Sequence, residues 1–437
     1  MSIRSLGNPN VRYDAKWLTS GSIDQPGLPV YNWFNTLTGS VGADRWYTGM
    51  LTPDNEFMYF AGTTKDGEPG HQDGFVGKFD KEGLCQWQQA WGSNGVNENY
   101  TGGCVVDSSG NVYAHGYQTY NYYATLVKYN SSGTVQFEKQ FYPTGYGCLA
   151  GGTAVDGDDI YCCGYVTSTQ GAYLAKFNTS GVVQWTRKLT GASSNNAEGN
   201  DVTVDSGGNP IMVGHADGNW WVAKYNSSGT IQWKRQLDVS ANCSPGAVIT
   251  DSDDNVIVSG ADNTNGHLGV AKWNSSGTIQ WQRKIEGISD PDGLCVDKSD
   301  NIYVGGQETS GTKGFWAKWD SSGTNLLQRT LNSSGSETIR GGMIDDTSDR
   351  GGGVSVIFSG WTDLGSDSAL VLKFPSDGSG TGTYGDWTYA SASLTEAATT
   401  ATEGAFGGTD SALTMNVGDQ SRTTTVTDCV SSTTVIS

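Results

Sequence analysis

The chain is short of apolar runs and of positive charge, and each shortage excludes a class of protein. None of its 437 residues lies in an apolar stretch near the roughly 18 residues that a membrane-spanning helix needs. The segment 1–30 is polar and lacks the apolar run of a secretory signal. The net charge is −19 and charged residues make up only 16% of the chain, so binding to a nucleic-acid backbone is not expected.

The short motifs of metal and catalytic sites are also missing. The eight cysteines show no C-x-x-C spacing, which favours buried thiols over a disulfide framework or a metal site. There is no nucleophile elbow, zinc-binding helix motif or phosphate-binding loop. The histidines share no position of a common pattern and are expected in ordinary loop or surface positions: His71, His115, His215 and His267. We therefore predict no catalytic, metal-ligating or cofactor-binding residue and no enzymatic activity. A pair of carboxylates for glycoside cleavage stays open, although no acidic pair stands out.

What the chain does contain is one pattern repeated seven times. Its clearest copy is AKYNSSGTIQWKR, which starts at Ala223. Each copy carries a lysine, and successive lysines are 46 to 55 residues apart: Lys78, Lys128, Lys176, Lys224, Lys272, Lys318 and Lys373. A period of that length, kept over seven copies, indicates an array of supersecondary units.

Each repeat is expected to fold as two β-hairpins. In residues 223–235, two short runs rich in aromatic and β-branched residues flank Asn226 and Gly229, which tolerate the positive φ of a tight turn. A second run of this kind lies upstream, as in VTVDSGGNPIMVG at 202–214, and nothing in the repeat has helical periodicity. Four antiparallel strands per unit, arranged radially, predict an all-β fold: a seven-bladed β-propeller of four-stranded blades.

A large aromatic residue recurs in the outermost strand of five repeats, where it is expected to seal the gap between neighbouring blades. These residues are Trp87, Phe137, Trp185, Trp233 and Trp281. The segment containing Trp33 resembles such an outer strand but precedes every complete repeat. We therefore expect it to complete the last blade, which contains Lys373, and so to close the ring. The segment around Trp387 competes for the same position.

The repeats assign residues 31–390 to the propeller, with an N-terminal arm at 1–30 and a Ser/Thr/Ala/Gly-rich C-terminal tail at 391–437. Alone, such a tail has too little apolar surface to offset the entropy lost on ordering. We expect both ends to be held by a partner surface.

Several acidic turns resemble calcium-binding loops, because alternating oxygen ligands are what calcium requires. The clearest contains Asp251, Asp253 and Asn255. Equivalent turns have Ser or Gly in place of the middle acid, so turn geometry is the favoured explanation, and calcium binding stays open. Asp290 and Asp292, in the segment SDPDG, are interpreted in the same way.

Neighbouring aromatic residues offer a second candidate site, a platform on which sugars stack. They are Trp220, Trp221, Tyr122 and Tyr123. Because aromatic residues in propeller strands commonly pack between blades, packing is the favoured interpretation.

The repeat unit resembles the bacterial seven-bladed β-propeller repeat family, often called SBBP repeats. DSSGNVYAHG from Asp107 and VAKYNSSGT from Val222 carry the likeness, which covers about residues 33–375. The resemblance implies the propeller fold and a display or interaction module rather than a defined catalyst.

The polar arm and the Gly/Thr/Ser/Ala-rich tail are similar in style to structural proteins of tailed bacteriophages, marine ones especially. That likeness implies a virion structural protein of the tail or capsid, made in the host cytoplasm. Its expected partners are other virion proteins, bound through the arm and the tail, and a host-surface glycan. The alternatives are a glycan-binding module outside a virion and, third, a propeller glycosidase or lyase.

Overall fold

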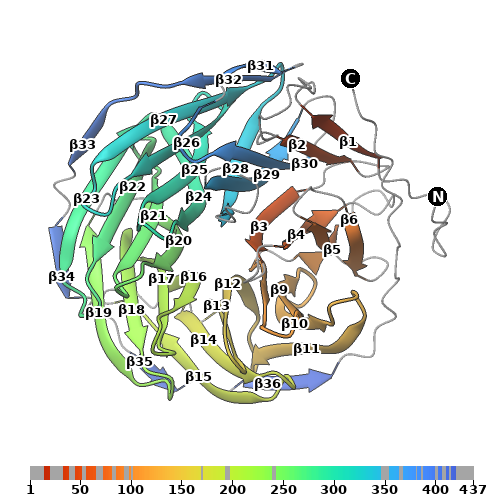
Figure 1. Ribbon diagram of the computed structural model, residues 1–437. Coiled ribbons are helices and arrows are strands. Elements are labelled where there is room, and N and C mark those ends of the chain that lie inside the picture. Colours follow the sequence, from red (N-terminus) through yellow and green to blue (C-terminus); the bar gives the residue numbers. More distant parts are fainter. Residues whose placement is uncertain are drawn as a thin grey trace.

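The computed structural model describes residues 14–19, 33–38, 45–51, 56–64, 72–80, 85–92, 98–99, 102–168, 171–191, 197–238, 243–345, 354–363, 368–379, 381–384, 387–398, 402–405, 410–412 and 415–419. Every regular element in these ranges is a β-strand, and the strands form seven antiparallel sheets arranged as a ring (Figure 1). The prediction of an all-β, seven-bladed propeller is therefore confirmed. The sheets are named blades I to VII in chain order.

The first three blades follow one another along the chain. Blade I contains β3 (Arg45–Leu51), β4 (Phe57–Thr64), β5 (Asp73–Asp80) and β6 (Cys85–Trp91). Blade II contains β7 (Glu98–Asn99), β8 (Cys104–Val106), β9 (Val112–Gln118), β10 (Tyr123–Tyr129) and β11 (Val135–Pro143). Blade III contains β12 (Cys148–Asp156), β13 (Asp159–Val166), β14 (Gly171–Asn178) and β15 (Val183–Leu189).

The next blades keep the same order, from the innermost strand to the rim. Blade IV contains β16 (Ala197–Val204), β17 (Pro210–Ala216), β18 (Asn219–Tyr225) and β19 (Ile231–Asp238). Blade V contains β20 (Cys243–Thr250), β21 (Val256–Asp262), β22 (His267–Trp273) and β23 (Ile279–Glu286). Blade VI contains β24 (Ile288–Val296), β25 (Ile302–Glu308), β26 (Lys313–Trp319) and β27 (Asn325–Asn332).

Blade VII closes the ring by joining both ends of the chain. Its inner strands are β28 (Glu337–Asp345), β29 (Ser355–Thr362) and β30 (Ser368–Pro375), and its outer strand is β2 (Trp33–Thr38). Trp33 is in register with Lys373, which confirms the predicted closure. A further strand from the arm, β1 (Asp14–Thr19), pairs with the outside of β2. Trp387 lies on blade VI instead, so the competing assignment is wrong.

The apolar core is divided among the interfaces between neighbouring blades. At the closure, Met58 and Phe60 of blade I pack with Ile357 and Val371 of blade VII. Equivalent clusters lie at the other interfaces. Each blade therefore buries both of its faces, which explains why the central strands are apolar along nearly their whole length.

The repeated Lys, Trp and Gly form a clamp between blades. The carbonyl oxygen of Ser275, in the β22–β23 turn of blade V, accepts hydrogen bonds from Lys224 Nζ at 3.3 Å and Trp233 Nε1 at 3.1 Å, both in blade IV. Gly277 of that turn lies against the indole, where a Cβ would come within 2.7 Å of the ring. The same pair of bonds starts from blades I, III and V. The prediction that the tryptophans seal the rim is confirmed.

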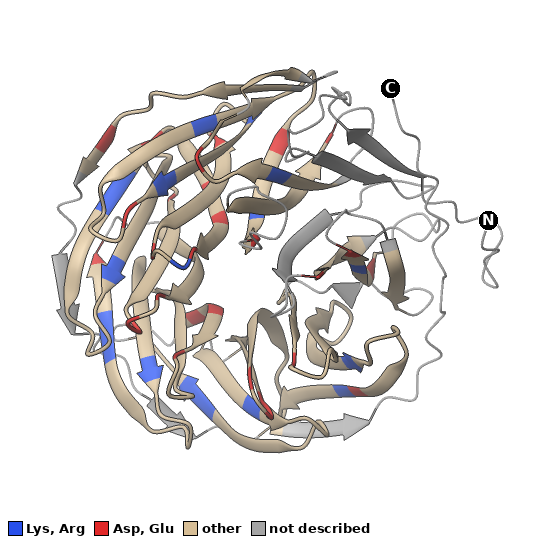
Figure 2. Cartoon of the chain, in the orientation of Figure 1, with Lys and Arg blue, Asp and Glu red and all other residues tan. Residues whose placement is uncertain are grey.

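Arginines of the outer strands add a second bond across these interfaces. Arg235 Nε donates to the carbonyl oxygen of Gly277 at 2.6 Å, and Arg283 Nε donates to that of Gly323 at 2.7 Å. Arg235 lies in β19 and Arg283 in β23, and Figure 2 shows Lys and Arg positions, in blue, spaced along the outer strands of the ring. Part of the small basic content of this acidic chain is therefore used to hold blades together.

The C-terminal segment returns around the outside of the ring as a belt. Its strands pair with the outer strands of blades VI, V, IV, III and II in turn, against the chain order (Figure 1). They are β32 (Trp387–Ser391) with its partner β31 (Gly382–Tyr384), β33 (Glu396–Ala398), β34 (Thr402–Ala405), β35 (Asp410–Ala412) and β36 (Met415–Asp419). The tail was expected to need a partner surface, and over its described part the ring itself supplies that surface.

Candidate functional site

The innermost strands of blades III to VII are each interrupted by a β-bulge near their beginning. In β16 the pairing register shifts between Gly199 and Asp201, and equivalent shifts occur in β12, β20, β24 and β28. A bulge leaves residues outside the ladder, bends the strand and re-aims a side chain. The bulged segments therefore present their residues at the centre of the ring.

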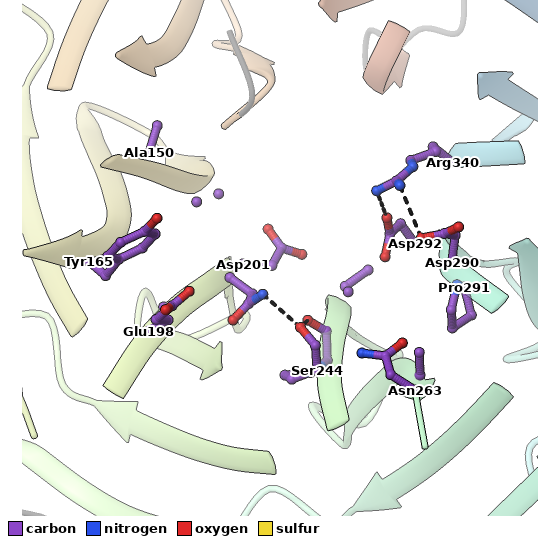
Figure 3. A pocket seen from close by; sticks show the side chains of 18 residues that line it. Ala150, Tyr165, Glu198, Asp201, Ser244, Asn263, Asp290, Pro291, Asp292 and Arg340 are labelled. Atoms are coloured by element: carbon purple, nitrogen blue, oxygen red, sulfur yellow. Dashed lines mark hydrogen bonds and ion pairs between the residues drawn. The ribbon is translucent and has the colours of Figure 1, made fainter. Parts of the chain in front are cut away.

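These segments line a cavity of about 400 Å³, named here the axial cavity (Figure 3). The inner strands of all five blades contribute to its wall, together with Tyr165 from β13 and Asn263 from the loop after β21. Figure 3 shows Arg340 and Asp292 on one side and Tyr165 and Glu198 on the other. Polar groups from separate blades therefore converge on one space, which is typical of a ligand site.

Asp201 is the most strongly perturbed acid of the cavity. Its Oδ1 accepts the N–H of Val202 at 2.8 Å, and its Oδ2 accepts the N–H of Val248 in blade V at 2.9 Å. Burial raises the pKa of Asp201 to about 7; the two backbone hydrogen bonds oppose this shift and the charge of Asp292 adds to it. Near neutral pH this carboxyl can therefore either donate or accept a proton.

Arg340, on β28, bridges two carboxylates of β24. Its Nη1 donates to Asp292 Oδ2, and its Nη2 donates to Asp290 Oδ1 at 3.1 Å. The guanidinium carbon lies 5.0 Å from the centre of the Trp361 ring, within cation–π range. The two carboxylates and the aromatic face hold this guanidinium in place, and among the described residues of the cavity wall it is the one cationic side chain.

A hydrogen-bonded chain runs along the opposite wall. Asn200 Nδ2 donates to Ser244 Oγ at 3.1 Å, and Asn200 Oδ1 lies 3.3 Å from His215 Nδ1. His215 Nε2 lies 3.8 Å from a carboxylate oxygen of Glu198. Burial lowers the pKa of His215, although the charge of Glu198 partly opposes this. The imidazole is therefore mostly neutral at pH 7 and offers Glu198 little compensating positive charge.

Two glycines make room for the carboxylates of the following blade. A Cβ on Gly152 would lie 2.2 Å from Asp201 Oδ1, and one on Gly246 would lie 1.9 Å from Asp292 Oδ1. Any larger residue at either position would displace the acid. The glycines of one blade and the acids of the next therefore form matched pairs around the cavity.

The repeat pattern of the sequence does not predict this site. Asp290 and Asp292 were interpreted as turn residues, but they lie in β24 at its bulge. The signal was the departure from the repeat: at one repeat position blades II, III and V have the glycines Gly102, Gly151 and Gly246, whereas blades IV, VI and VII have polar residues. These are Asn200, Asp292 and Arg340.

The histidines differ from their expected positions. His115 is fully buried, between Gly152 O and the Tyr173 hydroxyl, each 3.2 Å away, so its expected loop or surface position is wrong. His215 is half-buried beside Asn200 and Glu198, which line the axial cavity, and His71 lies outside the described residues. By contrast, six cysteines are buried thiols, as their scattered spacing predicts: Cys104, Cys148, Cys162, Cys163, Cys243 and Cys295.

The acidic turn at Asp251 is accounted for by its own hydrogen bonds. Asp251 Oδ1 accepts the backbone N–H groups of Asp253 and Asn255, and Oδ2 forms an ion pair with Lys272 at 2.7 Å. Burial raises the pKa of Asp251, but the bonds from Lys272 and Asn255 outweigh it and leave the pKa below its ordinary value. The turn interpretation explains this cluster.

The aromatic candidates divide into two groups. Trp220 and Trp221 are buried between blades, as the packing interpretation predicts. Tyr122 is 46% exposed and lies near Tyr120 and Tyr146, which are 78% and 41% exposed. Their loops, after β9 and before β12, are at the end of the blades where the inner strands begin, which is also the end that bears the bulges. Exposed tyrosines therefore occur on the face that carries the axial cavity.

Within the described ranges, no three His, Cys, Asp or Glu side chains converge as a metal site would require, and no helix is long and apolar enough to cross a membrane.

The sequence matches no protein-family model and no curated protein. Among solved structures it is similar to the dihydro-heme d1 dehydrogenase NirN, at 12% identity, with a TM-score of 0.46 over 85% of this chain and 76% of that chain. It is also similar to a gluconolactonase of Xanthomonas campestris, at 14% identity, with a TM-score of 0.36 over 61% of this chain and 83% of that one. A third is prolyl oligopeptidase B from Galerina marginata, at 11% identity, with a TM-score of 0.41 over 75% of this chain and 53% of that one.

These comparisons change one prediction. The expectation that the chain is not an enzyme is contradicted, because the three structures are those of a dehydrogenase, a lactonase and a peptidase. At identities of 11 to 14% and TM-scores below 0.5, they assign no particular activity to this chain. The defined class is that of a seven-bladed β-propeller with a polar axial cavity.

Proposed function

We propose that the chain is a structural protein of a virion, part of a tail or capsid, in which the propeller is a rigid platform for interactions. The observation that carries this proposal is the belt. It pairs with the outer strands of five blades, and β2, together with β1 of the arm, forms the outer edge of blade VII. Paired edges resist both unfolding and unwanted strand association, properties that suit a component of a large assembly.

The belt also indicates which parts of the ends can act as anchors. The described strands of residues 382–419 are bonded to the ring, and β1 is bonded to β2. We assign the contacts with other virion proteins to the remaining end segments, residues 1–13 and 420–437.

Mass spectrometry of purified particles tests this function most directly. The chain should be present in particles, and variants lacking residues 1–13 or 420–437 should fold but be lost from them. Circular dichroism of each purified variant serves as the control for folding. Normal incorporation of both truncated variants would show that the ends are not the anchors, and absence of the full chain from particles would exclude the virion role.

A second function, glycan binding, is favoured by the axial cavity and the exposed tyrosines on the same face. The cavity wall offers amide, hydroxyl and carboxylate groups from several blades, and Tyr120 and Tyr122 offer flat apolar surfaces beside polar groups. We propose that a saccharide of the host surface binds there.

A glycan array tests this second function. The labelled protein should bind a limited set of saccharides, and Asp292→Asn should weaken that binding because Arg340 loses a charged partner. Asp253→Asn, at an exposed turn, is the matched control and should bind as the parent does. No binding across a broad array would contradict the proposal.

A further inference from the structure

The axial cavity carries more negative than positive charge. Among the described residues, its wall contains the carboxyl groups of Glu198, Asp201, Asp290 and Asp292 and one guanidinium, that of Arg340. Arg340 is bonded to Asp290 and Asp292, so its charge is already matched on that side. Glu198 and Asp201, both on β16, are the remaining acids of the wall.

These carboxylates are held in place rather than displayed on flexible chains. Each oxygen of Asp201 accepts one backbone N–H, and Gly152 of the preceding blade leaves the space that the carboxylate fills. Each carboxylate oxygen can accept a further hydrogen bond. The cavity wall is therefore preorganised to receive a donor from a ligand, without the entropy cost of ordering the side chain first.

Groups that bind hydroxyls surround the two acids. The paired side chains of Asn200 and Ser244, the amide of Asn263 and the ring of Tyr165 all line the cavity. Amides and hydroxyls both donate and accept hydrogen bonds, as sugar hydroxyls do. A simple alkylammonium ion would leave most of these groups unmatched.

We infer that the axial cavity binds a hydroxylated ligand that carries a protonated amine, of the amino-sugar class, with the ammonium at Glu198 and Asp201. This inference rests on the proposed glycan-binding function and specifies that the bound saccharide is positively charged. Because burial raises the pKa of Asp201 to about 7, an ammonium bound beside it would shift that carboxyl from the protonated to the ionised form.

Isothermal titration calorimetry at pH 6.5 with three probes tests the inference. Glucosamine carries both the amine and the hydroxyls, N-acetylglucosamine carries no charge, and butylamine carries no hydroxyl. Glucosamine should bind at least ten-fold more tightly than either of the others. Equal binding of N-acetylglucosamine would overturn the role of charge, and equal binding of butylamine would overturn the role of the hydroxyls.

Variants locate the ammonium within the cavity. Glu198→Gln and Asp201→Asn should each weaken glucosamine binding about ten-fold or more and leave binding of N-acetylglucosamine nearly unchanged. Asp201→Asn disturbs two backbone hydrogen bonds. If that variant does not fold, Glu198→Gln alone tests the position of the ammonium. Asp253→Asn should match the parent. Binding of uncharged saccharides on the array without binding of glucosamine would overturn this inference while the glycan function stands.

Discussion

His115 is a buried histidine whose environment suits only the neutral ring. It is stacked on Phe141, and the imidazole with its proton on Nδ1 satisfies both Gly152 O and the Tyr173 hydroxyl. Burial lowers its pKa to about 4, although the bond to Gly152 O partly opposes the shift. Between about pH 4 and pH 6.5, His115 is therefore neutral in the folded protein and protonated in the unfolded chain.

The first prediction concerns acid stability. Because the folded pKa of His115 lies below its ordinary value of 6.5, the unfolded chain takes up the proton first, and stability is lost as the pH falls from about 6.5 to 4. The loss amounts to roughly 3 kcal/mol at pH 4. Urea unfolding at pH 7 and pH 4 should show a smaller pH dependence for His115→Gln than for the parent. An identical pH dependence of the two proteins would contradict this account.

Asp201 predicts the opposite pH dependence. Its folded pKa, about 7, lies above its ordinary value of 3.8, so its contribution to stability is present at low pH and is lost as the pH rises toward 7. The free energy of unfolding of the parent, compared with that of Asp201→Asn, should fall by about 2 kcal/mol between pH 5 and pH 8. Denaturant titrations of both proteins at the two pH values measure this. If the difference in unfolding free energy between the two proteins were the same at both pH values, ionisation of Asp201 would not destabilise the folded protein.

At the scale of the strand and turn, the repeated lysine is part of a buried ion pair. Lys224 Nζ lies 2.6 Å from Asp205 Oδ2, and their side chains are only 6% and 3% exposed. The pKa of Asp205 is raised by burial, but the bonds from Lys224 and Asn209 outweigh this and lower it overall. The same lysine donates to Ser275 O of the next blade. Lys224 thus compensates the charge of Asp205 in its own blade and donates a hydrogen bond to the neighbouring blade.

Replacing this lysine should destabilise the protein strongly. Lys224→Met keeps most of the volume but leaves the Asp205 carboxylate buried without its cation, at a cost of about 3 kcal/mol. Lys224→Met combined with Asp205→Asn should recover part of that loss, because no buried charge then remains. Chemical denaturation of both single variants and of the double variant at pH 7 gives the coupling energy. Additive effects would show that the ion pair contributes nothing.

How much the sequence predicts depends on whether an element repeats. The hairpins, the tryptophan clamp and the closing strand at Trp33 follow from a pattern kept over seven copies, because the same packing problem recurs at every blade interface. The axial cavity could not be found in that way. Its residues, such as Asn200 and Arg340, are those that depart from the pattern, and only the ring geometry brings them together.

The belt was unpredictable for a different reason. Its strands are three to five residues long and rich in Ser, Thr, Ala and Gly, so they carry no hydrophobic period. Their order comes from long-range pairing with outer strands already formed. A few side chains assist: Tyr389 stacks on Phe374, and Leu394 packs against the core between blades V and VI. The intrinsic β-strand propensity of the segment therefore contributes little to where the belt strands form.

At the scale of the whole molecule, the belt connects blades that are otherwise joined only to their neighbours. Glu396 accepts a hydrogen bond from Trp319 Nε1 of blade VI at 3.0 Å and lies 3.7 Å from Arg283 of blade V, so it ties two blades directly. Without the belt, the outer strands of blades II to VI would present open backbone groups to solvent. Open edges of this kind template association with other chains.

Removal of residues 380–437 should therefore lower stability and cause self-association. The free energy of unfolding should fall by several kcal/mol, because backbone hydrogen bonds on five blades are lost, each contributing roughly 1 kcal/mol net. Denaturant titration measures the stability, and sedimentation velocity measures the association. Removal of residues 420–437 alone is the matched control, since it keeps every described belt strand. Tyr389→Ala provides a milder version that leaves the chain length intact. A monomeric, equally stable protein without residues 380–437 would show that the belt covers the ring without holding it.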